Sequence, residues 1–177
     1  RHDAYSDIPW ILALRDWIRR AHDANVKLAG ICFGHQVIAQ ALGGEVVKST
    51  KGWGLGVSVH PMQEAKPWMQ PGLETIRILA SHQDQVAQLP PGATLLAGND
   101  FCPNFMFLQG DHIVAIQGHP EFSVEYNRAL IERRRDRLPD EHYQSSLSSL
   151  EGEVDSATMM QWLLQFLGML PVGPAVR

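Results

Sequence analysis

The feature that most constrains the fold is the segment Gly30-Ile31-Cys32-Phe33-Gly34, which lies between a short apolar run and a helical pattern. A strand that enters a helix through so sharp a turn pushes its central residue outward. Glycines on either side of such a turn remove the Cβ atoms that would clash there. We therefore expect a strand–turn–helix unit that presents the thiol of Cys32 instead of burying it.

The expected position of Cys32 also favours reactivity. The aligned peptide dipoles at a helix N-terminus favour the thiolate, which is the form that attacks carbonyl carbon. The segment thus indicates acyl-transfer chemistry with Cys32 as the nucleophile. The structural alternative is a small apolar cysteine that fills the end of a strand.

A second cluster, Gly118-His119-Pro120-Glu121-Phe122, directly follows the apolar run 112–117. A cysteine nucleophile needs a base for its proton, and a histidine base needs a carboxylate to orient it. If the apolar run is a parallel strand beside the elbow strand, both clusters emerge at the same sheet edge. We therefore predict a catalytic triad of Cys32, His119 and Glu121, although a lone His-x-Glu sequence also occurs in solvated loops.

These segments resemble the motifs of class I (triad) glutamine amidotransferases. Residues 30–36 match the Gly-x-Cys-x-Gly-x-Gln pattern of that family, and residues 118–121 match its His-Pro-Glu motif. Residues 81–86 are similar to the Ser-His-x-Asp-x-Val segment of GMP synthetase-type members. The resemblance covers most of residues 1–125, and it is strongest to the stand-alone GMP synthase-like branch.

The resemblance implies an α/β fold, namely a doubly wound, mostly parallel or mixed sheet flanked by helices, as in flavodoxin-like proteins. A family member would begin with a hydrophobic strand and a glycine-rich oxyanion loop, which are missing before the first helical pattern of this chain. One oxyanion donor is expected to be the backbone N–H of Phe33, and the second lies upstream of residue 1. We expect a single amidotransferase-like domain over residues 1–170 and a disordered tail over 171–177.

Apolar periodicity places the elements of this domain. Helices are predicted over 10–25, over 36–42 ending at Gly43-Gly44, from Ser123 to about residue 138, and around Met159 to Leu167. Strands are predicted over residues 27–31, 45–48, 55–60, 75–80, 94–97, 104–108 and 113–117. Residues 145–149 are expected to be a loop or a fraying helix end. The arginine-rich stretch 128–137 also carries acids, which indicates a solvated helix face.

The resemblance also suggests how substrate is bound. It implies that Gln36 helps to bind glutamine and that the loop Lys51-Gly52-Trp53-Gly54 gives backbone contacts to its amino-acid moiety. It implies a supporting role for His82, whereas His35 is expected to be a packing residue. The half-reaction requires no cofactor, and no histidine pair stands at metal-ligand spacing, so no metal is predicted.

The composition of the chain excludes several classes of protein. The 177 residues have 45% hydrophobic content, which suffices for one substantial core. A net charge of −4 gives no electrostatic footprint for nucleic acid or an anionic membrane. The two cysteines, Cys32 and Cys102, do not form a disulfide framework, and neither a signal peptide nor an apolar stretch of about 18 residues is found. A cytoplasmic protein is expected.

Three functions remain open at this point. The first is a glutaminase that converts L-glutamine through a γ-glutamyl thioester and gives ammonia to a synthase subunit. The second is a γ-glutamyl peptidase that acts on glutathione-like compounds with the same triad and no partner. The third is a non-catalytic subunit that senses glutamine or serves as a scaffold. The sequence does not identify the acceptor of the ammonia or the oligomeric state.

Overall fold

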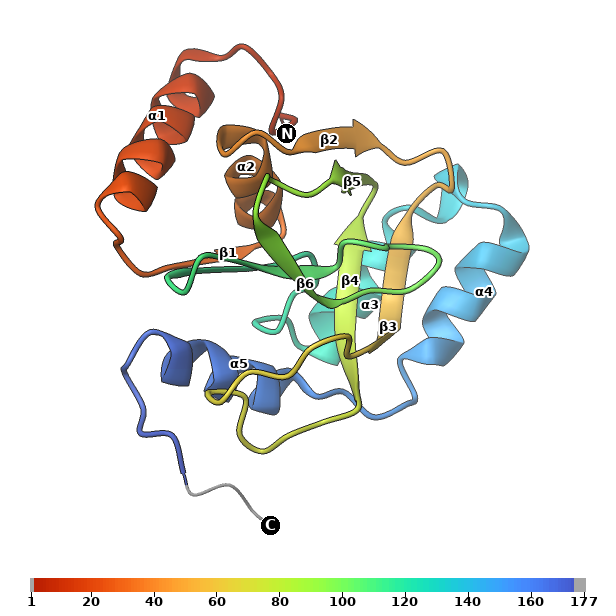
Figure 1. Ribbon diagram of the computed structural model, residues 1–177. Coiled ribbons are helices and arrows are strands. Elements are labelled where there is room, and N and C mark those ends of the chain that lie inside the picture. The colour runs from red at the N-terminus through yellow and green to blue at the C-terminus, as the bar shows by residue number, and fades with distance from the viewer. Residues whose placement is uncertain (1, 174–177) are drawn as a thin grey trace.

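The computed structural model describes residues 2–173 as an α/β protein in which helices flank a small central sheet (Figure 1). The helices are α1 (Pro9–Asp23), α2 (Phe33–Ala41), α3 (Val124–Glu132), the 3₁₀ turn η1 (Arg135–Arg137), α4 (Asp140–Ser149) and α5 (Ser156–Phe166). The strands are β1 (Leu28–Ile31), β2 (Glu45–Lys48), β3 (Gly54–Pro61), β4 (Thr75–His82), β5 (Asp84–Gln88), β6 (Ala93–Ala97), β7 (Met106–Gln109) and β8 (Ile113–Ile116).

The central sheet is mixed, with strand order β1-β8-β7-β6. Its one parallel pair is β1 with β8, in a register that sets Ile31 opposite Ile116. The pairs β8–β7 and β7–β6 are antiparallel. Two antiparallel ribbons, β2–β5 and β3–β4, lie outside this sheet. The predicted parallel pairing of the two motif-bearing strands is therefore confirmed.

The sheet is the middle of three layers. Alternate side chains of β8 enter different cores: Ile113 and Ala115 pack with α1 and α2, whereas Val114 and Ile116 pack with α5. This alternation is the period of two expected for a strand that is buried on both faces. Figure 1 shows the same arrangement, with α1 and α2 on one side of β1 and β8 and α5 on the other.

The elbow between β1 and α2 needs only one of its two glycines for space. A Cβ on Gly30 would lie 2.4 Å from Cδ1 of Ile38 and 2.8 Å from the carbonyl carbon of Gly34. At Gly34, by contrast, an added Cβ would meet no described atom within 4 Å. The expectation that both glycines avoid a clash is thus correct for Gly30 and wrong for Gly34, because Gly34 lies on the open side of the helix.

Several predicted elements need correction. The strand β5 was not expected, because its residues, Asp84–Gln88, contain no apolar run. The helix that starts after the Ser123 cap ends at Glu132 instead of residue 138, since Ile131 is its last fully buried side chain. Beyond it, Arg135–Arg137 form the 3₁₀ turn η1, which has no buried residue.

Residues 145–149 form the end of the regular helix α4, so of the two predicted alternatives, a loop and a helix end, the structure has the helix end. Tertiary contacts explain the helix, because the Ser149 hydroxyl accepts a hydrogen bond from the Val57 N–H of β3 at 2.9 Å. The same hydroxyl donates to the Ser146 carbonyl at 2.7 Å. The bond from Val57 connects α4 to β3, although the hydrophobic pattern of α4 is weak.

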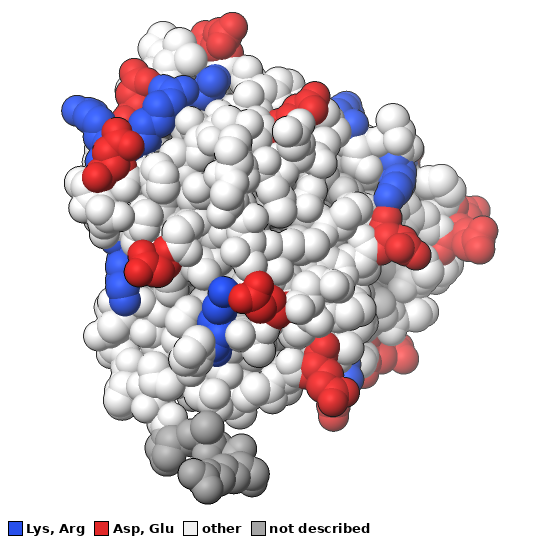
Figure 2. All heavy atoms as spheres, viewed as in Figure 1, with Lys and Arg blue, Asp and Glu red and all other residues white. Residues whose placement is uncertain are grey.

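Residues 171–173 have no regular secondary structure, and the rest of the predicted tail, 174–177, lies outside the described residues. No described helix has the length and apolar character that crossing a membrane requires. Figure 2 shows acidic and basic side chains next to one another over α1 and scattered elsewhere on that face. The viewed face therefore carries charges of both signs side by side.

Candidate active site

Cys32 occupies the turn between β1 and α2 in a conformation that few residues adopt. It is the N-cap of α2, with φ 50° and ψ −98°, and its N–H donates to the Ile116 carbonyl at 2.9 Å. A positive φ on a residue other than glycine is strained and is often found where function requires it. The elbow predicted from the sequence is therefore present, and it places Cys32 at the N-terminus of a nine-residue helix.

His119 lies at the same sheet edge, a few residues after β8. Its backbone N–H donates to the Leu79 carbonyl of β4 at 2.8 Å, and its ring stacks on Phe122 with centroids 3.8 Å apart. Its Nδ1 lies 2.7 Å from a carboxylate oxygen of Glu121. Because a carboxylate only accepts, Nδ1 carries the proton of the neutral ring, and Nε2 is left as the acceptor. This is the tautomer that a general base requires.

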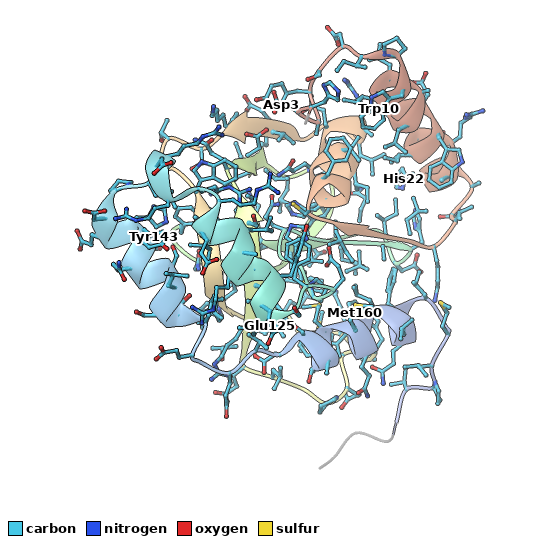
Figure 3. All side chains as sticks on the ribbon, turned by 180° about the vertical axis from the view of Figure 1, so that it is seen from behind. Asp3, Trp10, His22, Glu125, Tyr143 and Met160 are labelled. Carbon is cyan, nitrogen blue, oxygen red and sulfur yellow. The ribbon has the colours of Figure 1, made fainter. Side chains whose placement is uncertain are left out.

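Most of the predicted site residues line one cavity of about 490 Å³. Cys32 and His119 both line this cavity, which we call the Cys32 cavity. Four other predicted residues line it as well: Phe33, Gln36, Trp53 and His82. Asp3 also lines it, and comes from the start of the chain near β2 (Figure 3).

The remaining predicted residues lie just outside the cavity lining. Glu121 reaches the site only through His119. Gly52 has φ 83°, which favours glycine, and a Cβ there would meet no described atom within 4 Å. A Cβ on Gly54 would lie 2.8 Å from Nε2 of His82 and 2.9 Å from the ring of Phe101. Gly54 therefore lets the imidazole of His82 approach the backbone of β3.

The amide of Gln36 is engaged inside the protein. Its Nε2 donates to the Asp84 carbonyl at 2.9 Å and to Oε1 of Gln117 at 3.1 Å. Both amide protons are thus used by neighbouring residues, so only the carbonyl oxygen of this side chain is left for substrate. Gln36 therefore has fewer side-chain atoms available for contact with substrate than the sequence suggested.

Two titratable groups beside the nucleophile have shifted pKa values. Burial lowers the pKa of His82 to about 4, partly offset by a hydrogen bond with the Asp84 carbonyl. Burial, together with the nearby Asp3, raises the pKa of the Asp84 carboxyl to about 6. His82 is consequently neutral at pH 7. Asp84, which belongs to the motif of residues 81–86, begins β5 and lines the Cys32 cavity.

A second cavity of about 380 Å³, which we call the α4 cavity, shares Trp53 with the first. It lies between β3 and α4, and polar residues such as Lys51, Ser58 and His142 line it. The guanidinium of Arg134 stacks over the Trp53 ring at 4.4 Å. Arg134 therefore contacts the wall between the cavities, and the solvated-face reading was wrong for this member of the arginine-rich stretch.

The second cysteine differs from the first. Cys102 is buried, and burial raises the pKa of its thiol to about 12. Neither Cys32 nor Cys102 forms a disulfide bond within the described part of the chain. Within residues 2–173, no group of three or more histidine, cysteine or acidic side chains is placed to hold a metal ion.

Sequence reasoning missed Gln117, which is fully buried and has its Nε2 3.5 Å from Sγ of Cys32. A signal was present: Gln117 is the first residue after β8, as Cys32 is the first after β1. The parallel register, Ile31 opposite Ile116, makes these two positions neighbours.

The strand order, the cysteine elbow and the histidine–carboxylate pair at the same sheet edge define an α/β protein with one candidate active site around Cys32. The sequence pattern described as glutamine amidotransferase class-I matches residues 13–135. The chain belongs to this family.

Individual relatives agree with this assignment. Gamma-glutamyl peptidase 4 from Arabidopsis thaliana is 41% identical over 137 residues, which are 75% of this chain and 55% of the relative. A glutamine-hydrolyzing GMP synthase subunit from Thermococcus kodakarensis is 38% identical over 99 residues, 55% of this chain and 52% of the relative. The chain thus spans about half the length of the curated relatives it matches.

A solved structure supports the fold. A glutamine amidotransferase from Thermotoga maritima superimposes with a TM-score of 0.77 at 21% identity. The superposition covers 94% of this chain and 74% of the other. This likeness confirms the predicted flavodoxin-like α/β class.

Proposed function

We propose that the protein hydrolyses γ-glutamyl amide bonds through a cysteine acyl-enzyme, with γ-glutamyl peptides or related conjugates as the preferred substrates. The observation that carries this proposal is the shared cavity: Cys32, strained at a helix N-terminus, and His119, oriented by Glu121, line the same space. A nucleophile, a base and an orienting carboxylate are the parts that acyl transfer requires.

The reaction runs in two steps. The Cys32 sulfur attacks the γ-carbonyl carbon, and His119 accepts the thiol proton and gives it to the departing amine as the C–N bond breaks. Water then attacks the γ-glutamyl thioester with His119 as base, which releases glutamate and restores the thiol. The Phe33 N–H, at the first position of α2, would donate to the oxyanion.

Two observations support the proposal of a peptidase over that of a glutaminase, the function that the sequence alone had ranked first. The similarity to gamma-glutamyl peptidase 4 extends over more of the chain than that to the GMP synthase relative. The α4 cavity, separated from the Cys32 cavity by Trp53, also offers room for the part of a conjugate beyond its γ-glutamyl group. Free glutamine would need only the Cys32 cavity.

The second candidate is an amidotransferase subunit that hydrolyses L-glutamine and passes ammonia to a synthase. Membership of the class-I family and the similarity to a GMP synthase subunit support it. Under this reading, turnover of glutamine would rise when the synthase is bound, and γ-glutamyl peptides would be poor substrates.

A substrate panel separates these candidates. The value of kcat/KM would be measured for a γ-glutamyl dipeptide, glutathione, a glutathione S-conjugate and free glutamine, with Cys32→Ser as the blank. Preference for the peptides by tenfold or more supports the peptidase. Preference for glutamine supports the amidotransferase, and equal binding without turnover in wild type and Cys32→Ser would favour the sensing or scaffold role.

A further inference from the structure

The amide that faces the candidate nucleophile belongs to the protein itself. Gln117 has no exposed surface, and its Nε2 lies 3.5 Å from Sγ of Cys32. Its backbone is fixed by a hydrogen bond from its N–H to the Phe105 carbonyl at 2.8 Å. A buried amide held this firmly faces the sulfur with either its N–H or its oxygen, and the two choices have opposite effects on a thiolate.

The surrounding hydrogen bonds decide which end faces the sulfur. The Asp84 carbonyl can only accept, so the end of Gln36 that faces it, 2.9 Å away, must be the NH₂ group. The same nitrogen contacts Gln117 at 3.1 Å, so Gln117 must present its oxygen there. The NH₂ group of Gln117 is then the end directed at Cys32. The Asp84 carbonyl therefore fixes the orientation of the Gln36 amide. The Gln36 amide in turn fixes that of the Gln117 amide, which faces the Cys32 sulfur.

The histidine next to Gln117, His35, does not provide a positive charge near the Cys32 sulfur. His35 is fully buried, and its Nε2 lies 2.9 Å from the Asn104 carbonyl. Burial lowers the pKa of His35 to about 3, against smaller opposing effects of the Asn104 carbonyl and the Gln117 side chain. His35 is therefore a neutral ring at pH 7. It confines the Gln117 amide without placing a cation next to the sulfur.

We propose that Gln117 is a further catalytic residue, which donates a hydrogen bond from Nε2 to the Cys32 sulfur and favours its thiolate, and that Gln36 is the positioning residue that fixes its orientation. An N–H donor stabilises the charged form of the group it contacts. The donor adds to the effect of the N-terminus of α2, at which Cys32 is the N-cap. In this arrangement Gln36 acts on the nucleophile through Gln117 as well as lining the cavity.

The inference rests on the proposed function only for the role of Cys32 as nucleophile, and its test needs no substrate. The rate of alkylation by iodoacetamide would be measured from pH 5 to 10 on the full chain, with peptide mass spectrometry to count adducts at Cys32 alone. The pH at half-maximal rate reports formation of the thiolate. Failure of every substrate in the panel would leave this measurement unaffected.

Three variants and a matched control define the experiment. Gln117→Met removes the donor with little change in volume, and Gln117→Glu replaces the donor with an acceptor of the same shape. Gln36→Met leaves the Gln117 amide free to turn. Gln109→Met is the control, because Gln109 is also a buried glutamine and donates one side-chain hydrogen bond, from Nε2 to the Pro91 carbonyl. It pairs with Ile113, at the end of β8 away from Cys32.

The expected result is an upward shift of the midpoint by roughly half a unit to one unit in Gln117→Met. Gln117→Glu should shift it by more than one unit, and Gln36→Met by less than Gln117→Met. Gln109→Met should lower stability without moving the midpoint. The proposal is overturned if folded Gln117→Met keeps the wild-type midpoint; if that variant does not fold, an unmoved midpoint in Gln117→Glu overturns it equally.

Discussion

His119 and Glu121 are separated by a single proline, yet their side chains form a hydrogen bond of 2.7 Å between Nδ1 and a carboxylate oxygen. Pro120 fixes its own φ and restricts His119, so the turn holds the two side chains together with little entropic cost. Phe122 covers the imidazole face in a stack with an interplanar angle of 9°. The imidazole of His119 is therefore oriented by the three residues that follow it in sequence, while the bond from its N–H to the Leu79 carbonyl fixes its backbone on β4.

Glu121→Gln should lower kcat/KM for the preferred γ-glutamyl substrate by about 10²–10⁴-fold, because the amide can donate to Nδ1 and so favours the wrong tautomer. Steady-state kinetics of purified variants measures this. Glu125→Gln is the matched control, since Glu125 is an exposed acid in the first turn of α3 (Figure 3). A loss of similar size in both variants would contradict an orienting role for Glu121.

Covalent labelling should be confined to Cys32. With 6-diazo-5-oxo-norleucine, a glutamine-like electrophile, we expect one adduct at Cys32 and complete loss of labelling in Cys32→Ala. Cys102→Ala should label as wild type does, because the Cys102 thiol is buried and the pKa of that thiol is raised to about 12. Intact-protein and peptide mass spectrometry reads the outcome. An adduct on Cys102 in folded protein would contradict the assignment.

The sequence predicted those parts of the site that depend on local order. The elbow at Cys32 follows from glycine spacing, and the pairing of β1 with β8 follows from two apolar runs that each end in a polar motif. Other contacts between distant segments could not be predicted from the sequence. Asp84 reaches the Cys32 cavity because β5 pairs with β2, and that pairing brings together residues that no periodicity links.

The arginine-rich stretch shows a second limit of local pattern. The alternation of charges correctly predicted a solvated position for Arg135, which forms an ion pair with the exposed Asp140. They could not show that Arg134 covers Trp53 at 4.4 Å, since Trp53 lies about eighty residues earlier in the chain. A charged side chain with an apolar stem covers whatever aromatic surface the fold brings to it. Only the packing of α3 and η1 near β3 specifies that partner.

Gly30→Ala should destabilise the protein by about 1–3 kcal/mol, because its Cβ would lie 2.8 Å from the backbone of Gly34 and the elbow would have to open. Gly34→Ala should be neutral or stabilising by up to about 1 kcal/mol, since the added methyl group meets no described atom within 4 Å. Urea unfolding followed by circular dichroism compares the two. Equal midpoints would show that the elbow is not packed as described.

Stability should decrease as the pH falls below about 6.5, because three buried histidines resist protonation in the folded protein. Burial lowers the pKa of His35 and of His60 to about 3, and that of His82 to about 4. The unfolded chain takes up these protons near pH 6.5, so their stabilisation is complete above that pH and is lost toward pH 3–4. Asp84 opposes this trend, since the raised pKa of its carboxyl favours proton uptake by the folded state.

His60→Gln tests one of these three histidines on its own. Its Nε2 lies 2.7 Å from the Ser58 hydroxyl, and its ring stacks on Phe105 with centroids 3.5 Å apart, so glutamine keeps a polar group but cannot titrate. The free energy of unfolding between pH 7 and 4.5 should fall less steeply in the variant, by about one proton or 1.4 kcal/mol per pH unit. The variant will also be less stable at pH 7, where the stack is lost. Urea titrations at each pH give both values, and parallel curves for variant and wild type would mean that His60 is protonated equally in the folded and unfolded states.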